Sequence, residues 1–163
     1  LADTHEGDVV EICPAAGPIA AEIGGRIARH GGVALVIDYG GWRSLGDTFQ
    51  ALRDHRLEDP LANPGAADLT AHVDFEPIAQ AARAAGAEVS GLTGQGAFLE
   101  RLGITDRARA LAARMTGAAL DSHIAAHRRL THPQEMGTLF KVLGIHAAGS
   151  PLPAGLNPPD ARA

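Results

Sequence analysis

The feature that most constrains the fold is residues 33–37, which read Val-Ala-Leu-Val-Ile. This run is short, continuously apolar and rich in β-branched residues, and it does not alternate with polar residues. Such a run is typical of a strand that is buried on both faces in a parallel sheet. Before it, three isoleucines spaced four residues apart predict a helix over residues 14–30, which ends at Gly31–Gly32. A helix, a glycine turn and a buried strand form half of a βαβ crossover.

The rest of the chain continues the alternation of helices and strands, which predicts an α/β fold with a layered sheet and flanking helices. We expect further strands at residues 48–52, 87–92 and 139–145, and helices that start near residues 75, 97, 105, 120 and 133. Only three of the strands are well marked, fewer than a free-standing open sheet needs. Residues 147–163 hold four prolines and no periodicity, so we expect a domain over residues 1–146 followed by a disordered Pro-rich tail.

Charge and hydropathy exclude several classes of function. The chain has 14 basic and 19 acidic side chains and no basic stripe with interleaved aromatics, so nucleic acid is not expected as a partner. No apolar run approaches the roughly 20 residues of a membrane-spanning helix, and residues 1–8 lack the apolar centre of a signal peptide. Lys141 is the only lysine, and the Arg- and Ala-rich composition is typical of a GC-rich bacterial genome. We therefore expect a bacterial, cytoplasmic protein in which the lone Cys13 acts as a small hydrophobe.

Asp38 and Tyr39 directly follow the apolar run. In open α/β sheets, ligands bind beyond the carboxyl ends of the strands, so the Asp38 carboxylate is a candidate for binding a ribose, an amine or a guanidinium. An Asp at the start of a glycine turn also satisfies nearby backbone N–H groups. The sequence leaves both interpretations open.

A second candidate site is the segment 68–74, Asp-Leu-Thr-Ala-His-Val-Asp, which places two carboxylates and an imidazole within seven residues. A histidine flanked by aspartates can be held in one tautomer and act as a base. If the segment is extended, Asp68, Thr70, His72 and Asp74 share one face. The alternative is a polar loop whose last residue, Asp74, caps the next helix.

Two other patterns favour structural interpretations. Residues 91–96, Gly-Leu-Thr-Gly-Gln-Gly, lie between a strand and a helix, but their glycine order does not fit a dinucleotide fingerprint, so we expect a tight turn. His123 and His127 are four residues apart on a predicted helix, a spacing that suits a metal. The neighbouring residue is Ile124 rather than the glutamate of zinc proteases, so we expect one partly buried and one solvated histidine.

Three stretches together resemble one family. They are G-V-A-L-V-I-D-Y-G at residues 32–40, G-D-T-F-Q-A-L-R-D-H-R-L-E-D-P-L-A-N-P-G-A-A-D-L-T-A-H-V-D-F at residues 46–75, and T-G-Q-G-A-F-L-E-R-L-G at residues 93–103, echoed by M-G-T-L-F-K-V-L at residues 136–143. The chain resembles the MidA family of S-adenosylmethionine (SAM)-dependent methyltransferases from about residue 7 to residue 145. The resemblance implies SAM as cofactor and a protein substrate, because mitochondrial members methylate an arginine of a respiratory complex I subunit and assist its assembly.

The resemblance also indicates what this chain lacks. The family's Gly-rich SAM loop, its acidic ribose contact and its Asn-Glu-Phe motif lie upstream, and no residues here match them. We therefore expect the chain, which starts at Leu1 rather than Met, to be a fragment. It would be the C-terminal half of a Rossmann-like class I methyltransferase sheet, with the SAM site mostly upstream and little activity alone. The alternative is a non-catalytic protein-binding or assembly module.

Candidate roles follow from chemistry and position rather than from the family. A guanidinium has a pKa above about 12, so a carboxylate or imidazole must hold it and accept its proton. His72, Asp74 and Asp38 are the candidate catalytic residues. The candidates for substrate binding are Tyr39, Asp68, Thr70 and Gln95.

Overall fold

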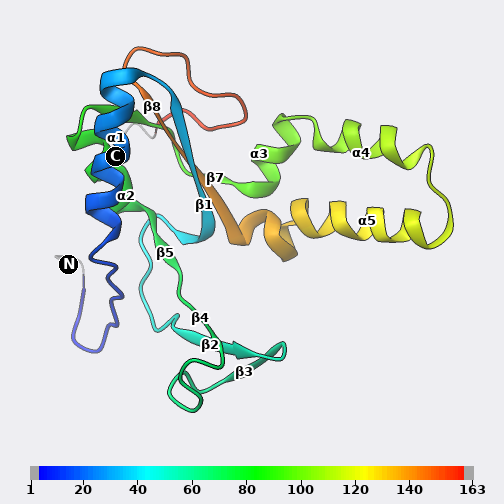
Figure 1. The fold of residues 1–163 in the computed structure, drawn as a ribbon, viewed down its shortest axis with the longest axis horizontal. Coiled ribbons are helices and arrows are strands. Elements are labelled where there is room, and N and C mark those ends of the chain that lie inside the picture. The colour runs from blue at the N-terminus through cyan, green and yellow to red at the C-terminus, as the bar shows by residue number, and fades with distance from the viewer. Residues whose placement is uncertain (1–3, 160–163) are drawn as a thin grey trace.

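The fold is built on a mixed sheet with a smaller sheet and a helical hairpin attached to it (Figure 1). A computed structural model describes residues 4–159. The main sheet has the order β5-β1-β8-β6, with β7 also paired to β8, and the small sheet has the order β3-β2-β4. The strands are β1 (Val33–Gly41), β2 (Gln50–Arg53), β3 (Arg56–Glu58), β4 (Asp68–Thr70), β5 (Val73–Asp74), β6 (Ala87–Val89), β7 (Thr93–Gly94) and β8 (Phe140–Ala147). The helices are α1 (Ala16–His30), α2 (Phe75–Ala84), α3 (Gln95–Arg101), α4 (Ile104–Ala112), α5 (Gly117–Thr131) and the single turn η1 (Pro133–Gly137).

The α/β class and the strand at residues 33–37 are confirmed, but the surroundings predicted for this strand are wrong. β1 pairs antiparallel with β8 along its length, from Val33 opposite His146 to Tyr39 opposite Phe140. It is parallel only to β5, at Gly40 and Gly41. Val33, Leu35 and Ile37 remain 54%, 46% and 47% exposed. The reason is that the helices of the described chain cover only the opposite face of β1.

Helices α1 and α2 pack side by side on that covered face (Figure 1). The predicted helix over residues 14–30 and the helix predicted from residue 75 are both confirmed, with α1 starting two residues late. The buried side chains at the centre of this core are Ile27, Phe75, Ile78, Val89, Leu143 and Ile145. Their one-sided packing sets the orientation of the sheet edge at which β1 ends.

The predicted disordered tail is wrong for residues 147–159, the first of which, Ala147, ends β8. Leu156 is buried against Phe98 and Val142 on the other face of β8. Asn157 donates from its backbone N to Thr93 Oγ1 at 2.9 Å and from Nδ2 to Leu92 O at 3.1 Å. The prolines do not prevent packing, because this segment forms few strand-pairing hydrogen bonds. It is held by Leu156, by Asn157 and by Arg101, which donates to Gly155 O and to Asn157 Oδ1. Residues 160–163 of the predicted tail lie outside the described residues.

Two parts project from this body in Figure 1: the small sheet β2–β4 and the hairpin of α4 and α5. Among the described residues, no helix is both long enough and apolar enough to cross a membrane.

The contact between α1 and α2 predicts opposite effects for two adjacent glycines. A Cβ on Gly24 would lie 2.8 Å from Ala82 O and 2.9 Å from its Cα, whereas a Cβ on Gly25 would meet nothing closer than 3.5 Å. Gly24→Ala should therefore force the helices apart and cost about 2 kcal/mol of unfolding free energy. Gly25→Ala should raise the unfolding free energy by about 0.5–1 kcal/mol, because alanine is more favourable than glycine in a helix interior. Urea unfolding of both variants checks this, and equal effects would contradict the close approach.

Candidate active site

The candidate site lies where β1 ends and meets β5. Gly40 is opposite Val73 and Gly41 is opposite Asp74, so Asp38 and Tyr39 are brought next to the segment that carries His72. Gly40 has φ 149°, and a Cβ there would lie 2.1 Å from Val73 O. Only glycine allows this approach of the two backbones. The residues predicted from the two separate motifs therefore meet at the carboxyl end of β1.

Tyr39 is the centre of a small aromatic cluster at this end. Its ring is 5.8 Å from the His72 ring and 5.3 Å from the Phe140 ring, edge to face in both cases. Tyr39 and Phe140 are half-buried and His72 is exposed. Partly exposed aromatic rings beside an exposed imidazole suit a flat cation such as a guanidinium.

A hydrogen-bond network that the sequence analysis missed holds the backbone of His72. The His72 N–H donates to Thr48 Oγ1 at 2.9 Å, the Thr48 hydroxyl donates to Glu11 Oε2, and the Thr48 N–H donates to Glu11 Oε1 at 3.0 Å. The hydrogen bond from the Thr48 side chain, together with backbone donors and the nearby His72, holds the pKa of the Glu11 carboxyl below its usual range. Glu11 and Thr48 lie far from His72 in sequence, so no local motif signals them.

Asp74 does not cap α2 with its side chain, although it occupies the N-cap position. Its Oδ1 atom is buried and has no hydrogen-bond partner within the described residues. Burial raises the pKa of the Asp74 carboxyl, helped by the charge of Glu76. The Glu76 backbone amide and the charge of Arg43 oppose part of this rise in pKa. The Glu76 amide donates its hydrogen bond to Trp42 O at 3.0 Å rather than to Asp74. A carboxyl with a raised pKa and a free oxygen is better suited to accept a proton than an ordinary aspartate.

Arg43 and Glu76 form an ion pair next to Asp74. The guanidinium donates from both Nε and Nη2 to the two carboxylate oxygens, the Nη2–Oε1 distance being 2.8 Å. The hydrogen bond from Arg43 lowers the pKa of Glu76. Two carboxyls at the same end of α2 therefore have pKa values shifted in opposite directions, lowered for Glu76 and raised for Asp74.

Asp38 lies opposite Lys141 in the β1–β8 ladder. Its Oδ1 accepts the backbone N–H of the next residue, Tyr39, at 2.8 Å, as the turn interpretation predicted. Lys141 directs its ammonium group to the carbonyls of Thr138 and Leu139, and burial lowers the pKa of this lysine. The half-buried Asp38 thus lies at the end of β1, directly before Tyr39 in the chain, with one oxygen already used.

The remaining predicted residues are not brought to this cluster by any contact of the described chain. β4 pairs with β2, so Asp68 and Thr70 belong to the small sheet and do not share one face with His72 and Asp74. The segment 68–74 is divided between two sheets because residues 71 and 72 leave the ladder. Asp68 instead lines an open hollow of about 530 Å³ beside Leu52 and Arg53.

Gln95 is buried, and its Nε2 donates to Leu130 O of α5 at 2.9 Å. The neighbouring glycines serve packing as well: a Cβ on Gly96 would lie 2.4 Å from Thr131 O, and one on Gly94 would lie 3.2 Å from Gly137 O. The predicted tight turn at residues 91–96 is therefore filled by backbone and offers no open cradle for a phosphate or a cofactor.

Comparison with known proteins gives one family. A family model described as "Putative S-adenosyl-L-methionine-dependent methyltransferase" matches residues 1–93 of this chain. The Drosophila melanogaster protein arginine methyltransferase NDUFAF7 homolog, mitochondrial, is 40% identical over 121 residues, which cover 74% of this chain and 28% of the relative. Human protein arginine methyltransferase NDUFAF7, mitochondrial, is 38% identical over 139 residues, 85% of this chain and 31% of the relative. The chain thus spans about a third of the length of these relatives.

Solved structures share the fold. A crystal structure of a COG1565 superfamily protein from Burkholderia thailandensis aligns with a TM-score of 0.76 and 31% identity, covering 91% of this chain and 41% of the other. A second Burkholderia thailandensis structure of that superfamily, bound to S-adenosyl-homocysteine, aligns with a TM-score of 0.74 and 32% identity, covering 91% and 40%.

The raised pKa of Asp74 predicts a pH-dependent effect of Asp74→Asn. A carboxyl whose pKa is higher in the folded than in the unfolded state costs stability once the pH exceeds both values, and costs nothing below both. The asparagine variant should therefore be more stable than the wild type at pH 7, and the two should converge at pH 3. Urea unfolding across this range measures the difference. A variant that is less stable at pH 7 would show that Asp74 is a structural anion.

Proposed function

This chain belongs to that family of S-adenosyl-L-methionine-dependent methyltransferases, and on this premise we propose that it is the C-terminal part of a protein arginine N-methyltransferase. The observation that carries the proposal is the cluster at the end of β1. It combines aromatic rings suited to a guanidinium, Tyr39 and Phe140, with an imidazole able to accept a proton, His72. Asp74 follows two residues later in the same segment, opposite Gly41. The resemblance read from the sequence is confirmed by the family model and by the structural neighbours.

In the proposed reaction the residues of this chain hold the substrate rather than the methyl donor. The attacking guanidinium nitrogen must lose a proton as it takes the methyl group, and the high pKa of guanidinium makes a positioned base necessary. His72, whose backbone is tied to Thr48 and Glu11, is the proposed base. Asp74 and Asp38 supply negative charge that keeps the guanidinium oriented, and Tyr39 packs against its plane.

The described residues do not fit the methyl donor itself. The glycine turn between β7 and α3 is packed against Thr131 and Gly137, and within residues 4–159 no strand ends in an open Gly-rich loop at a helix N-terminus. SAM supplies the methyl group in this family, and we place its binding site in the part of the longer protein that precedes residue 1. The same part would cover the exposed apolar face of β1 formed by Val33, Leu35 and Ile37.

The names of the relatives suggest the kind of substrate. Because they are mitochondrial protein arginine methyltransferases, the proposed substrate here is an arginine of another protein. The finer proposal is a respiratory complex I subunit, methylated in the cytoplasm of a bacterium.

A second candidate is a binding or assembly module without chemistry of its own. Its support is that the described part of this chain shows no open cofactor cradle, while its small sheet exposes apolar residues such as Leu57 and Leu69. An assay of the full-length protein distinguishes the two candidate functions. Methyl transfer to a protein arginine supports the enzyme, and SAM binding without transfer supports the module.

The missing cofactor contacts predict that residues 1–163 alone bind SAM with a dissociation constant weaker than about 1 mM, because a site deprived of its orienting polar contacts loses most of its affinity. Isothermal titration calorimetry of this chain against the full-length protein measures the difference. Micromolar binding by this chain alone would place the SAM site within it.

The proposed base predicts the effect of His72→Ala in the full-length protein. Turnover should fall about a hundredfold, in the usual range for loss of a general base, while SAM affinity stays unchanged. His72→Asn keeps a hydrogen-bonding side chain but accepts no proton near neutral pH, so it should lose as much turnover as alanine.

Melting temperatures provide the control for both variants. His72 is exposed and its hydrogen bond to Thr48 comes from the backbone, so neither substitution should destabilise the fold. Near-normal turnover of a stable His72→Ala protein would remove His72 from the reaction and leave Asp74 and Asp38 as the candidate bases.

A further inference from the structure

The hairpin of α4 and α5 has an amphipathic pattern with nothing packed on it. Neither α4 nor α5 has a buried residue in the described chain. Leu111 on α4 and Ile124 on α5 are 43% and 56% exposed. The hairpin contacts the remaining chain mainly through α3 and η1 at its base, and Figure 1 shows it projecting away from the sheet.

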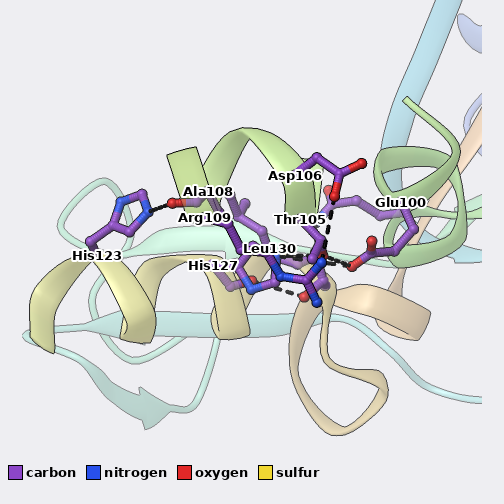
Figure 2. A network of polar contacts seen from close by, with 10 residues as sticks. Glu100, Thr105, Asp106, Ala108, Arg109, His123, His127 and Leu130 are labelled. Atoms are coloured by element: carbon purple, nitrogen blue, oxygen red, sulfur yellow. Dashed lines mark hydrogen bonds and ion pairs between the residues drawn. The ribbon is translucent and has the colours of Figure 1, made fainter. Parts of the chain in front are cut away.

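The two helices are nevertheless held firmly together. His123 Nε2 lies 3.0 Å from Ala108 O, and His127 Nε2 lies 3.1 Å from Thr105 Oγ1, so each histidine of α5 reaches α4 (Figure 2). Both are half-buried, which corrects the expectation that one of them is solvated. The four-residue spacing of His123 and His127 therefore places both rings on the side of α5 that packs against α4. A preformed surface of this kind loses little conformational entropy when it binds.

A groove runs along one side of the hairpin. It has a volume of about 230 Å³. Its lining residues are Thr105, Ala108, Arg109 and Ala112 from α4 and His123, Ile124 and His127 from α5. Ile124, one of these lining residues, is exposed. The groove has room for one aliphatic side chain such as another isoleucine.

The charges around Ile124 indicate what fits there. Asp121, Ile124, Ala125 and Arg128 are spaced i, i+3, i+4 and i+7, so they share one face of α5. Asp121 and Arg128 are both exposed, and the Arg128 guanidinium is held in place by a hydrogen bond from Nε to Glu135 Oε1 at 2.8 Å. An antiparallel copy of α5 centred between Ile124 and Ala125 places each Asp121 opposite an Arg128 and brings the isoleucines together. This face is therefore complementary to itself.

We propose that the hairpin is a dimerisation surface, on which α5 packs antiparallel against α5 of a second copy of this protein. The pairing is isologous, because a twofold axis at residues 124–125 makes both copies contribute the same patch. The Ile124 side chain of each copy enters the groove of the other, and two Asp121–Arg128 pairs flank the axis. The proposal is independent of methyl transfer, since no residue of the candidate active site takes part.

The size of the surface sets the strength of the dimer. α5 has 15 residues and α4 has nine, so the longer helix is about 22 Å long. Such a face is smaller than the roughly 800 Å² per partner of a standard stable interface. The expected dimer is reversible, with a dissociation constant on the order of 10 µM.

Sedimentation equilibrium of the full-length protein from about 1 to 200 µM tests the proposal. The wild type should dissociate on dilution. Asp121→Arg and Arg128→Asp each place like charges opposite one another twice, so each should weaken self-association at least tenfold. An equimolar mixture of these two variants restores opposite charges at both pairs, so it should form a heterodimer about as well as the wild type.

Ile124→Glu should also abolish the dimer, and Leu57→Glu is its matched control, because Leu57 is 69% exposed on the small sheet away from the hairpin. Three results would overturn the proposal: a wild type that stays monomeric at 200 µM, a dimer unaffected by the charge substitutions, or a variant mixture that stays monomeric although both variants melt like the wild type. The first would mean that another protein or another part of the same chain covers the groove.

Discussion

The antiparallel ladder between β1 and β8 is the interaction on which the rest of this structure depends. It joins the strand after α1 to the last strand of the chain, more than a hundred residues away, through seven residue pairs. β6 and β7 attach to β8, and β5 attaches to the end of β1, so every strand of the main sheet is placed by this pair. Leu143 and Ile145 of β8 are fully buried under α1 and α2, which ties the ladder to the core.

The same ladder explains why the candidate site forms where it does. Because β8 runs opposite to β1, its first residue, Phe140, reaches the end of β1 and packs against Tyr39. The short parallel pairing at Gly40 then brings in the segment that carries His72. Aromatic rings from two strands and an imidazole from a loop thus meet without any shared sequence motif.

Electrostatics divides the ionisable groups at this site into two kinds. Glu11 and Glu76 are stabilised as anions by hydrogen bonds, from Thr48 and from Arg43 respectively, and their pKa values are lowered. Asp74 loses solvent without gaining a partner for its buried oxygen, and its pKa is raised. Groups of the first kind stay ionised and hold their partners in place, whereas a carboxyl of the second kind is neutral over a wider pH range.

Local patterns in the sequence determined the elements themselves: the apolar run at residues 33–37, the helix before it and the helix that starts near residue 75 each carry their signal within a few turns of chain. Hydrophobic periodicity is a local property, so these could be read directly. Tertiary structure alone decided which faces are covered. Residues 33–37 read as buried on both sides, yet one side is open, because burial depends on neighbours that no local window contains. For the same reason Asp68 and Thr70 belong to a different sheet from His72, Leu156 packs although its segment reads as a tail, and the support of His72 comes from Glu11 and Thr48.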